Sequence, residues 1–138
     1  MKKIIAVLFP LILAFPISGC SNEESAEKFE LLGKWGMVSG SITNSDGTTD
    51  RYGELGKDNY YQTLEYKADG TYIKVAMPSG PTSYGTYTYN NSNQTMKYKL
   101  DGDRYYTNAT ITIHKANKIT LFTDWGSVGS MTQYLVKI

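Results

Sequence analysis

The 138 residues carry 14 Lys and Arg against 13 Asp and Glu, and this near-neutral balance excludes a strongly basic nucleic-acid-binding domain. A single histidine, His114, excludes a metal site built on several histidines, and a single cysteine excludes an intramolecular disulfide. Twelve tyrosines, 13 glycines and many threonines favour strands over helices.

Residues 1–19 have the form of a secretory leader. Lys2 and Lys3 precede an apolar run, residues 4–17, that contains two prolines and is short for a bilayer-spanning helix. The run ends in Ile17-Ser18-Gly19-Cys20, which resembles the lipobox of bacterial lipoprotein precursors. That resemblance implies cleavage before Cys20, acylation of this residue by fatty acids such as palmitate, and attachment to a membrane through the lipid.

Residues 20–30 are predicted to be a flexible tether, because they are polar, acidic and without apolar periodicity. Ser21 stands where lipoproteins retained at the inner membrane carry aspartate, so the resemblance implies the outer membrane. The acidic run is also similar to the surface-export signal of some Bacteroidetes lipoproteins, and an ordinary solvated linker is the alternative. Both the periplasmic face and the cell surface therefore stay open.

Residues 31–138 are predicted to form one all-β domain. Alternating apolar and polar residues bounded by turn residues indicate strands over 32–43, 60–67, 71–77, 83–89, 94–100, 105–115, 118–124 and 130–138. The connections are mostly short, and no helical stretch is available to cover a sheet face. We therefore expect an eight-stranded antiparallel up-and-down β-barrel, which leaves no open sheet edge.

Three motifs follow one another along these predicted strands. Leu32-Gly33-Lys34-Trp35 opens the first, an Asp69-Gly70 hairpin flanked by Tyr66 and Tyr72 joins the second and third, and Gly85-Thr86-Tyr87 lies in the fourth. Their order and spacing resemble the lipocalin-like domains of small bacterial lipoproteins, which implies a lipocalin-like barrel. In lipocalins proper an arginine near the last strand packs on the tryptophan, whereas this last strand offers Lys137.

Aromatic side chains are the first candidates for a binding site in the barrel lumen. Trp35, Tyr66, Tyr72, Tyr87 and Tyr98 fall on the predicted strands, and tyrosine combines apolar area with a polar tip. Core packing is the alternative for Trp35. For the tyrosines, the alternative is that tyrosine is a good strand former and tolerates half-burial.

Lys74 is a candidate for holding an anionic ligand in the lumen. A glycine-bulge turn at Asp69-Gly70 pairs Leu64 with Lys74, and this register points both side chains into the barrel. The alternative is that the apolar stripe Ile73-Val75-Met77 faces inward. This stripe, and the cost of burying an unpaired ammonium, favour the second arrangement.

The polar stretch over residues 44–59 is predicted to be a long loop. Loops of this length in compact domains are often lids, and we expect this one to cross the mouth of the barrel. Tyr52 and Tyr60 are then candidates to close over a ligand. A disordered surface loop is the alternative.

No convincing catalytic constellation is present. His114 falls on the polar face of its strand and is predicted to be exposed, and the Cys20 thiol would be blocked by lipid. Without a cofactor or metal motif, the sequence favours a monomeric, non-enzymatic, lipid-anchored binding protein with a small apolar or amphipathic ligand. The alternative is an interaction or inhibitor module with a filled core and a tyrosine-rich surface that docks an envelope protein. A lumen of about 300 Å³ or more favours the ligand.

Overall fold

The computed structural model describes residues 28–138, so the expected leader, Cys20 and most of the expected tether lie outside the described residues. The strands are β1 (Gly33–Asn44), β2 (Thr49–Tyr52), β3 (Gln62–Tyr66), β4 (Thr71–Ala76), β5 (Thr82–Asn90), β6 (Thr95–Leu100), β7 (Thr107–Lys115), β8 (Lys118–Asp124) and β9 (Gly129–Lys137). A single turn of 3-10 helix, η1 (Gly126–Val128), precedes β9. Over the described range, no helix is long and apolar enough to span a membrane.

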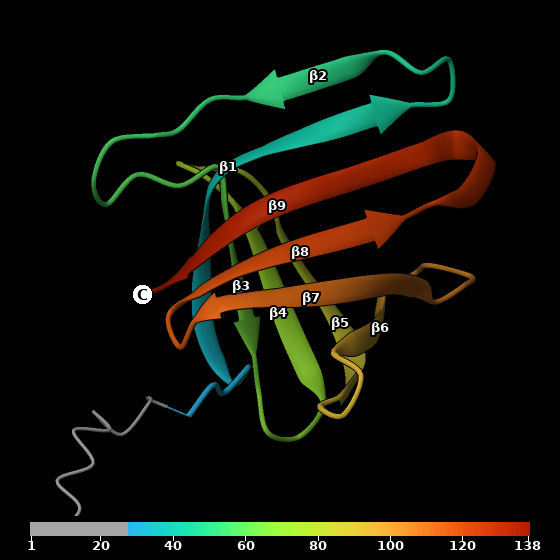
Figure 1. The fold of residues 1–138 in the computed structure, drawn as a ribbon. Coiled ribbons are helices and arrows are strands. Elements are labelled where there is room, and N and C mark those ends of the chain that lie inside the picture. The colour runs from blue at the N-terminus through green and yellow to red at the C-terminus, as the bar shows by residue number, and fades with distance from the viewer. Residues whose placement is uncertain (1–27) are drawn as a thin grey trace, which may run out of the picture.

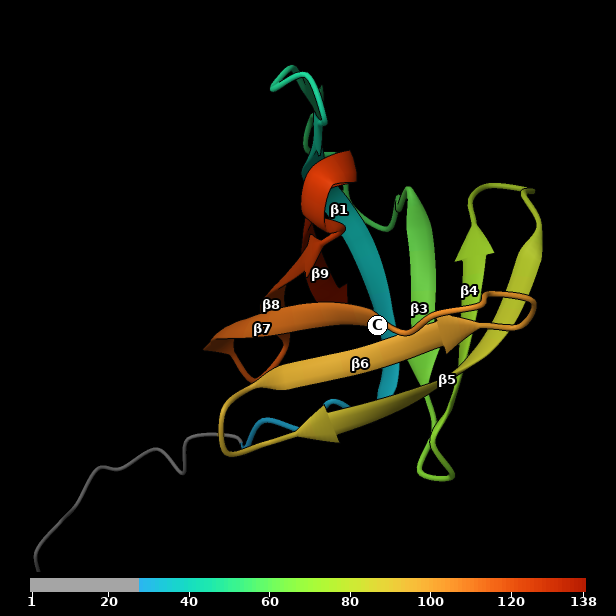
Figure 2. The ribbon, with the colours of Figure 1, turned by 90° about the vertical axis from the view of Figure 1, so that its right-hand side faces the viewer.

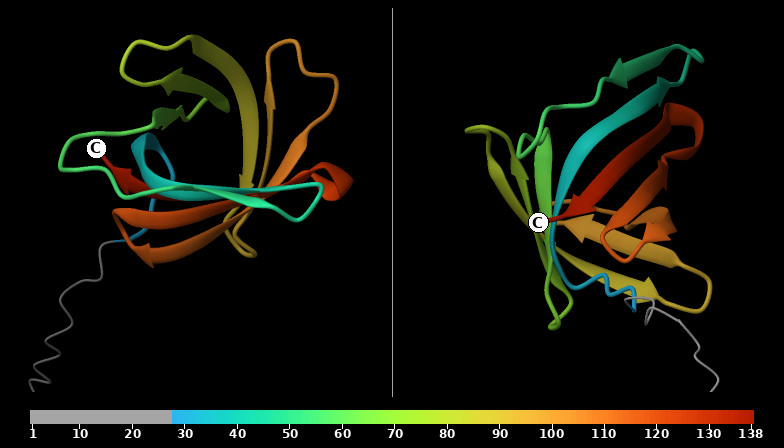
Figure 3. Two further views of the ribbon diagram at one scale, coloured as in Figure 1. Left: turned by 90° about the horizontal axis from the view of Figure 1, so that it is seen from above. Right: turned by 60° about the vertical axis from the view of Figure 1, so that its left-hand side comes forward.

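The strands form one antiparallel sheet that closes on itself. The order β1-β3-β4-β5-β6-β7-β8-β9 is completed by pairing of β9 with β1 along nearly the whole length of both strands. In Figure 1, β7, β8 and β9 run across the direction of β3 and β4, which lie behind them. The view from above in Figure 3 shows these two groups on opposite sides of the interior. The predicted eight-stranded antiparallel barrel is therefore confirmed.

β2 is an extra strand inside the segment that we expected to be a loop. It pairs with the far half of β1, from Gly40 opposite Tyr52 to Thr43 opposite Thr49. Figure 2 shows this hairpin rising beyond the barrel, so the structure corrects the expectation that residues 44–59 cross the mouth. All four residues of β2 are exposed, which explains why the strand has no apolar alternation to reveal it.

Trp35 closes the end of the barrel at which β1 begins. Its ring has no solvent exposure, and its Nε1–H donates a 2.8 Å hydrogen bond to the Leu31 carbonyl oxygen. The Lys137 ammonium lies 5.5 Å from the Trp35 ring centroid and donates a 3.0 Å hydrogen bond to the Glu30 carbonyl oxygen. The end of the last strand thus places a cation over the tryptophan ring.

The segment just before β1 packs across this closed end. The Phe29 ring lies 6.1 Å from Trp35 and 6.4 Å from Tyr89 on β5, between ring centroids. Residues 28–30 were expected to end the flexible tether, but Phe29 is half-buried against the core. Phe29 therefore packs with the barrel, whereas Lys28 and Glu30 are exposed. Burying an aromatic side chain against apolar surface is favourable. The polar residues on either side of Phe29 hid this packing position in the sequence.

Side chains fill the half of the barrel next to the closed end. Met96, Ile111, Ile119 and Leu135 are each at most 2 % exposed; Ile111 lies in the middle of β7, and the other three lie near the strand ends that meet there. Each fully buried side chain of this size contributes roughly 1.5–3 kcal/mol. The opposite half, where β3 and β9 begin and β6 and β8 end, is filled less completely and contains a cavity.

The hairpin between β3 and β4 has the predicted turn. Lys67 N–H donates to the Thr71 carbonyl oxygen at 2.9 Å, and Gly70 has φ 83°, a value that favours glycine. The Asp69 carboxylate accepts hydrogen bonds from the Thr71 hydroxyl at 2.6 Å and from its backbone N–H at 2.9 Å. Both hydrogen bonds lower the pKa of Asp69, and the bond from the Thr71 hydroxyl has the larger effect. Leu64 pairs with Lys74, which is the register that a glycine-bulge turn implies.

Candidate functional site

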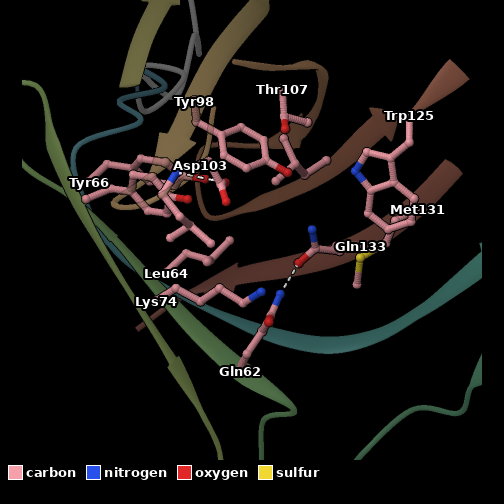
Figure 4. Close-up of a pocket in the computed structure, with 13 residues that line it drawn as sticks. Gln62, Leu64, Tyr66, Lys74, Tyr98, Asp103, Thr107, Trp125, Met131 and Gln133 are labelled. Atoms are coloured by element: carbon pink, nitrogen blue, oxygen red, sulfur yellow. Dashed lines mark hydrogen bonds between the residues drawn. The ribbon is translucent and has the colours of Figure 1, made fainter. Parts of the chain in front are cut away.

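A cavity of about 190 Å³ occupies the open half of the barrel. Its walls come from β3, β4, β6, β7, β8 and β9 and from the connections after β6 and β8 (Figure 4). Drug-sized pockets begin at about 300 Å³, whereas a cavity of about 150 Å³ holds benzene. The cavity is therefore smaller than the lumen that we expected to favour a ligand, and it limits any ligand to one ring or a short branched chain.

Aliphatic side chains form much of the cavity wall. Leu64, Leu100, Leu121 and Met131 approach it from four different strands. Each lies on the inward-facing side of its strand, as the alternation of residues in a strand requires. These walls favour the apolar part of a ligand, because they remove it from water.

Three tyrosines, Tyr66, Tyr72 and Tyr98, form a tyrosine cluster between the cavity and the filled core. The Tyr66 and Tyr72 rings stack with centroids 5.9 Å apart, and Tyr98 meets Tyr72 edge-on at 5.7 Å. Burial is the main cause that raises the pKa of all three phenols, so they stay protonated and can donate hydrogen bonds. The Tyr98 hydroxyl lies 3.4 Å from Thr123 Oγ1.

The Tyr72 hydroxyl stands out within this cluster. The residue is 3 % exposed, and its hydroxyl has no hydrogen-bond partner among residues 28–138. Leaving a buried hydroxyl unsatisfied costs about 1–3 kcal/mol. The hydroxyl oxygen is itself buried, so it is not exposed on the cavity surface.

Lys74 lines the cavity, contrary to the arrangement that the sequence favoured. Its side chain extends into the open half of the barrel in Figure 4, on the same face of β4 as Tyr72. Ile73 and Val75 lie on the other face and are half-buried, so the expectation that they face inward is wrong. Both faces of β4 carry apolar residues, and the pairing of Leu64 with Lys74 decides between them.

Two glutamines join opposite walls near the open end. Gln62 Nε2 on β3 donates a hydrogen bond to Gln133 Oε1 on β9, across 71 residues of sequence. Gln133 is 4 % exposed, and both side chains line the cavity. Their inward orientation follows from the alternation Gln62-Leu64-Tyr66 and Met131-Gln133-Leu135, a signal that sequence reasoning missed.

Two connections complete the open end. Trp125 follows β8 and Asp103 follows β6, and both are solvent-exposed on one side while they line the cavity. The Asp103 carboxylate accepts a 3.3 Å hydrogen bond from the Leu100 backbone N–H. Strand periodicity carries no information about such residues, because they lie outside the strands.

Of the residues proposed from the sequence, Tyr66, Tyr72, Tyr98 and Lys74 line the cavity. The others do not. Trp35 belongs to the closed end, and the Tyr87 hydroxyl donates at 2.7 Å to the Lys67 carbonyl oxygen near the β3–β4 hairpin.

The two lid candidates lie away from the cavity as well. Tyr52 belongs to β2, and its ring packs edge-on against Tyr61 with centroids 5.3 Å apart. Tyr60 packs over the backbone of Gly36, and neither Tyr52 nor Tyr60 lines the cavity. The segment that contains Tyr52 extends the sheet along β1. The prediction that these two tyrosines close over a ligand is therefore wrong.

Other reactive side chains are dispersed over the described part of the chain. His114 is exposed, as predicted, and its Nε2 lies 2.7 Å from Thr120 Oγ1. Between residues 28 and 138, no three His, Cys, Asp or Glu side chains converge closely enough to hold a metal ion.

No protein-family model matches the chain, and no curated protein or solved structure matches it. The function of the cavity is therefore inferred from its own geometry. Its distinguishing properties are a small volume, aliphatic and aromatic walls, and a few polar groups near the open end.

Proposed function

We propose that this protein is a non-enzymatic binding module that holds a small amphipathic molecule in the open half of the barrel. The cavity carries this proposal, because it combines apolar walls with a small number of convergent polar groups, as binding sites for small molecules do. Its 190 Å³ restrict the ligand to a body of about one ring. A long acyl chain is disfavoured by the filled half of the barrel.

We further propose that the module is anchored to the outer membrane by lipid on Cys20. The lipobox-like sequence before Cys20 supports this, and the short segment between Cys20 and the barrel limits how far the domain can lie from the bilayer. The chain enters the barrel at the closed end, beside Phe29 and Trp35. The cavity opens at the opposite end, so a ligand would enter from the aqueous side.

A second candidate function is docking of an envelope protein. Tyr105 and Tyr106, in the connection between β6 and β7, are 75 % and 54 % exposed. Arg104 and Lys99 lie over their rings, with the cationic groups 6.0 and 5.2 Å from the respective centroids. Exposed tyrosine and arginine are enriched at protein interfaces, which favours this loop as the contact.

Native mass spectrometry of the purified protein separates the two candidates. Met131→Trp places a larger ring in the cavity, and Tyr134→Trp makes a matched change on the outer face of the same strand. We expect a co-purifying small molecule on the wild type and on Tyr134→Trp, and its loss from Met131→Trp. A wild-type protein without any bound molecule, or equal retention by both variants, would contradict binding in the cavity.

A further inference from the structure

Several polar side chains that line the cavity can donate hydrogen bonds. Lys74 contributes an ammonium and Gln133 an amide NH₂ group, because the Gln133 carbonyl oxygen already accepts a hydrogen bond from Gln62. In Figure 4 the indole nitrogen of Trp125 lies on the edge of the ring that faces the cavity. Three different side chains therefore offer donors to the same small space.

The Lys74 ammonium is the strongest of these donors. Figure 4 marks no hydrogen bond between it and any other residue that lines the cavity. The residue is half-buried between Leu64 on the neighbouring strand and the tyrosine cluster. The residues that line the cavity give this ammonium no hydrogen-bond partner, and an anion in the cavity would supply one.

Asp103 is the one carboxylate in the lining. It lies on the side of the cavity opposite Lys74 in Figure 4, and the two form no ion pair. Asp103 is exposed to solvent and accepts a hydrogen bond from the Leu100 N–H, so its charge is solvated. Asp103 therefore leaves Lys74 free to bind another anion. Its own negative charge disfavours ligands that carry a second negative charge next to it.

We propose that the cavity recognises the carboxylate of a small aromatic or branched aliphatic acid. The inference rests on the proposed function. Lys74 pairs with the carboxylate, the Gln133 amide lines the same cavity and can donate a hydrogen bond to it, and the aliphatic walls take the apolar body. The volume of 190 Å³ accommodates one ring together with the carboxylate.

Three probes of the same shape and different charge test this inference. Phenylacetate carries the carboxylate, 2-phenylethanol is its neutral counterpart, and phenethylamine carries a positive charge. Binding is measured with the purified protein by isothermal titration calorimetry and by the change in tryptophan fluorescence. Trp125 lines the cavity, whereas Trp35, the other tryptophan of the chain, lies in the closed end.

We expect phenylacetate to bind about tenfold or more tightly than 2-phenylethanol, the effect of a hydrogen bond to a charged group, and phenethylamine to bind most weakly. Lys74→Met keeps the length of the side chain without its charge and should reduce phenylacetate affinity to that of the alcohol. Lys118→Met is the matched control, because Lys118 is exposed on β8 near the closed end. It should change neither affinity.

Two other results are informative in different ways. If phenylacetate and 2-phenylethanol bind equally, and Lys74→Met changes neither, recognition of the carboxylate is refuted while binding in the cavity stands. Tighter binding of phenethylamine would also refute it and would assign the dominant charge to Asp103. If none of the three probes binds to the wild type, both this inference and the proposed function are contradicted.

Discussion

Lys137 provides the most direct test of how the barrel is closed. Its ammonium makes two interactions that tie the last strand to the first residues of the domain: it lies 5.5 Å from the Trp35 ring centroid and 3.0 Å from the Glu30 carbonyl oxygen. Lys137→Met removes both and keeps most of the apolar stem. Lys137→Arg keeps the charge, and arginine packs well on aromatic rings.

The expected loss follows from the two interactions. A cation over an aromatic ring contributes about 0.5–1 kcal/mol when exposed and about 2 kcal/mol when desolvated. The hydrogen bond to the Glu30 carbonyl is on the surface and contributes about 0.5–1.5 kcal/mol. Because contributions of adjacent groups are not additive, we expect Lys137→Met to lower the free energy of unfolding by about 1–2.5 kcal/mol. Lys137→Arg should stay within about 0.5 kcal/mol of the wild type.

Urea unfolding followed by tryptophan fluorescence measures these differences, with an unchanged m value as the sign that the same surface is exposed on unfolding. Lys118→Met again serves as the control, because it removes an exposed lysine from the neighbouring strand. If Lys137→Met unfolds at the wild-type urea concentration, the contacts at Trp35 do not hold this end closed. If arginine destabilises as much as methionine, the lysine acts through its shape and not its charge.

Three further predictions concern packing and ionisation. Gly85→Ala should destabilise the barrel by about 1–3 kcal/mol in urea unfolding, because its Cβ would overlap a carbonyl oxygen of β6; Gly53→Ala, where no atom lies within 4 Å, should change stability little. Burial raises the pKa of the tyrosine cluster, so the folded state retains protons that the unfolded state loses near pH 10, and stability should fall as the pH rises above about 10. In a spectrophotometric titration at alkaline pH, the phenols of the cluster should ionise only when the protein unfolds, and early ionisation of all tyrosines would contradict this. The pKa of Asp69 is lowered chiefly by the Thr71 hydroxyl, so the stabilisation it gives is present at neutral pH and is lost as the pH falls below about 4. NMR titration should show this pKa rising toward its ordinary value in Thr71→Val, and an unchanged pKa would exclude the hydroxyl as the cause.

The architecture of the domain could be predicted because it depends on local patterns. Alternation along each strand and the turn residues between strands reveal the eight barrel strands to within about two residues at each end. The Asp69-Gly70 turn indicated one possible pairing of β3 with β4, which the structure contains. The strand β2 escaped prediction because all its side chains are exposed and no pattern of burial marks it.

The composition of the cavity was decided by the tertiary structure. Alternation divides β4 into two faces, one with Tyr72 and Lys74 and one with Ile73 and Val75, but both faces carry apolar side chains. The inward face is chosen by closure of the barrel around Leu64 and Tyr66, which are contributed by another strand. Local patterns cannot report such a choice, because the free energy of burial depends on which distant side chains surround a residue.

The same reason applies to the polar groups at the open end. Gln62 and Gln133 meet across 71 residues of sequence, and Asp103 and Trp125 reach the cavity from connections outside the strands. The sequence by itself determined an all-β domain, because apolar and polar residues alternate along each strand and turn residues separate the strands. Only the folded barrel brought an ammonium, two amides and a buried hydroxyl together, since contacts between distant segments exist only once closure has brought their strands to the same end.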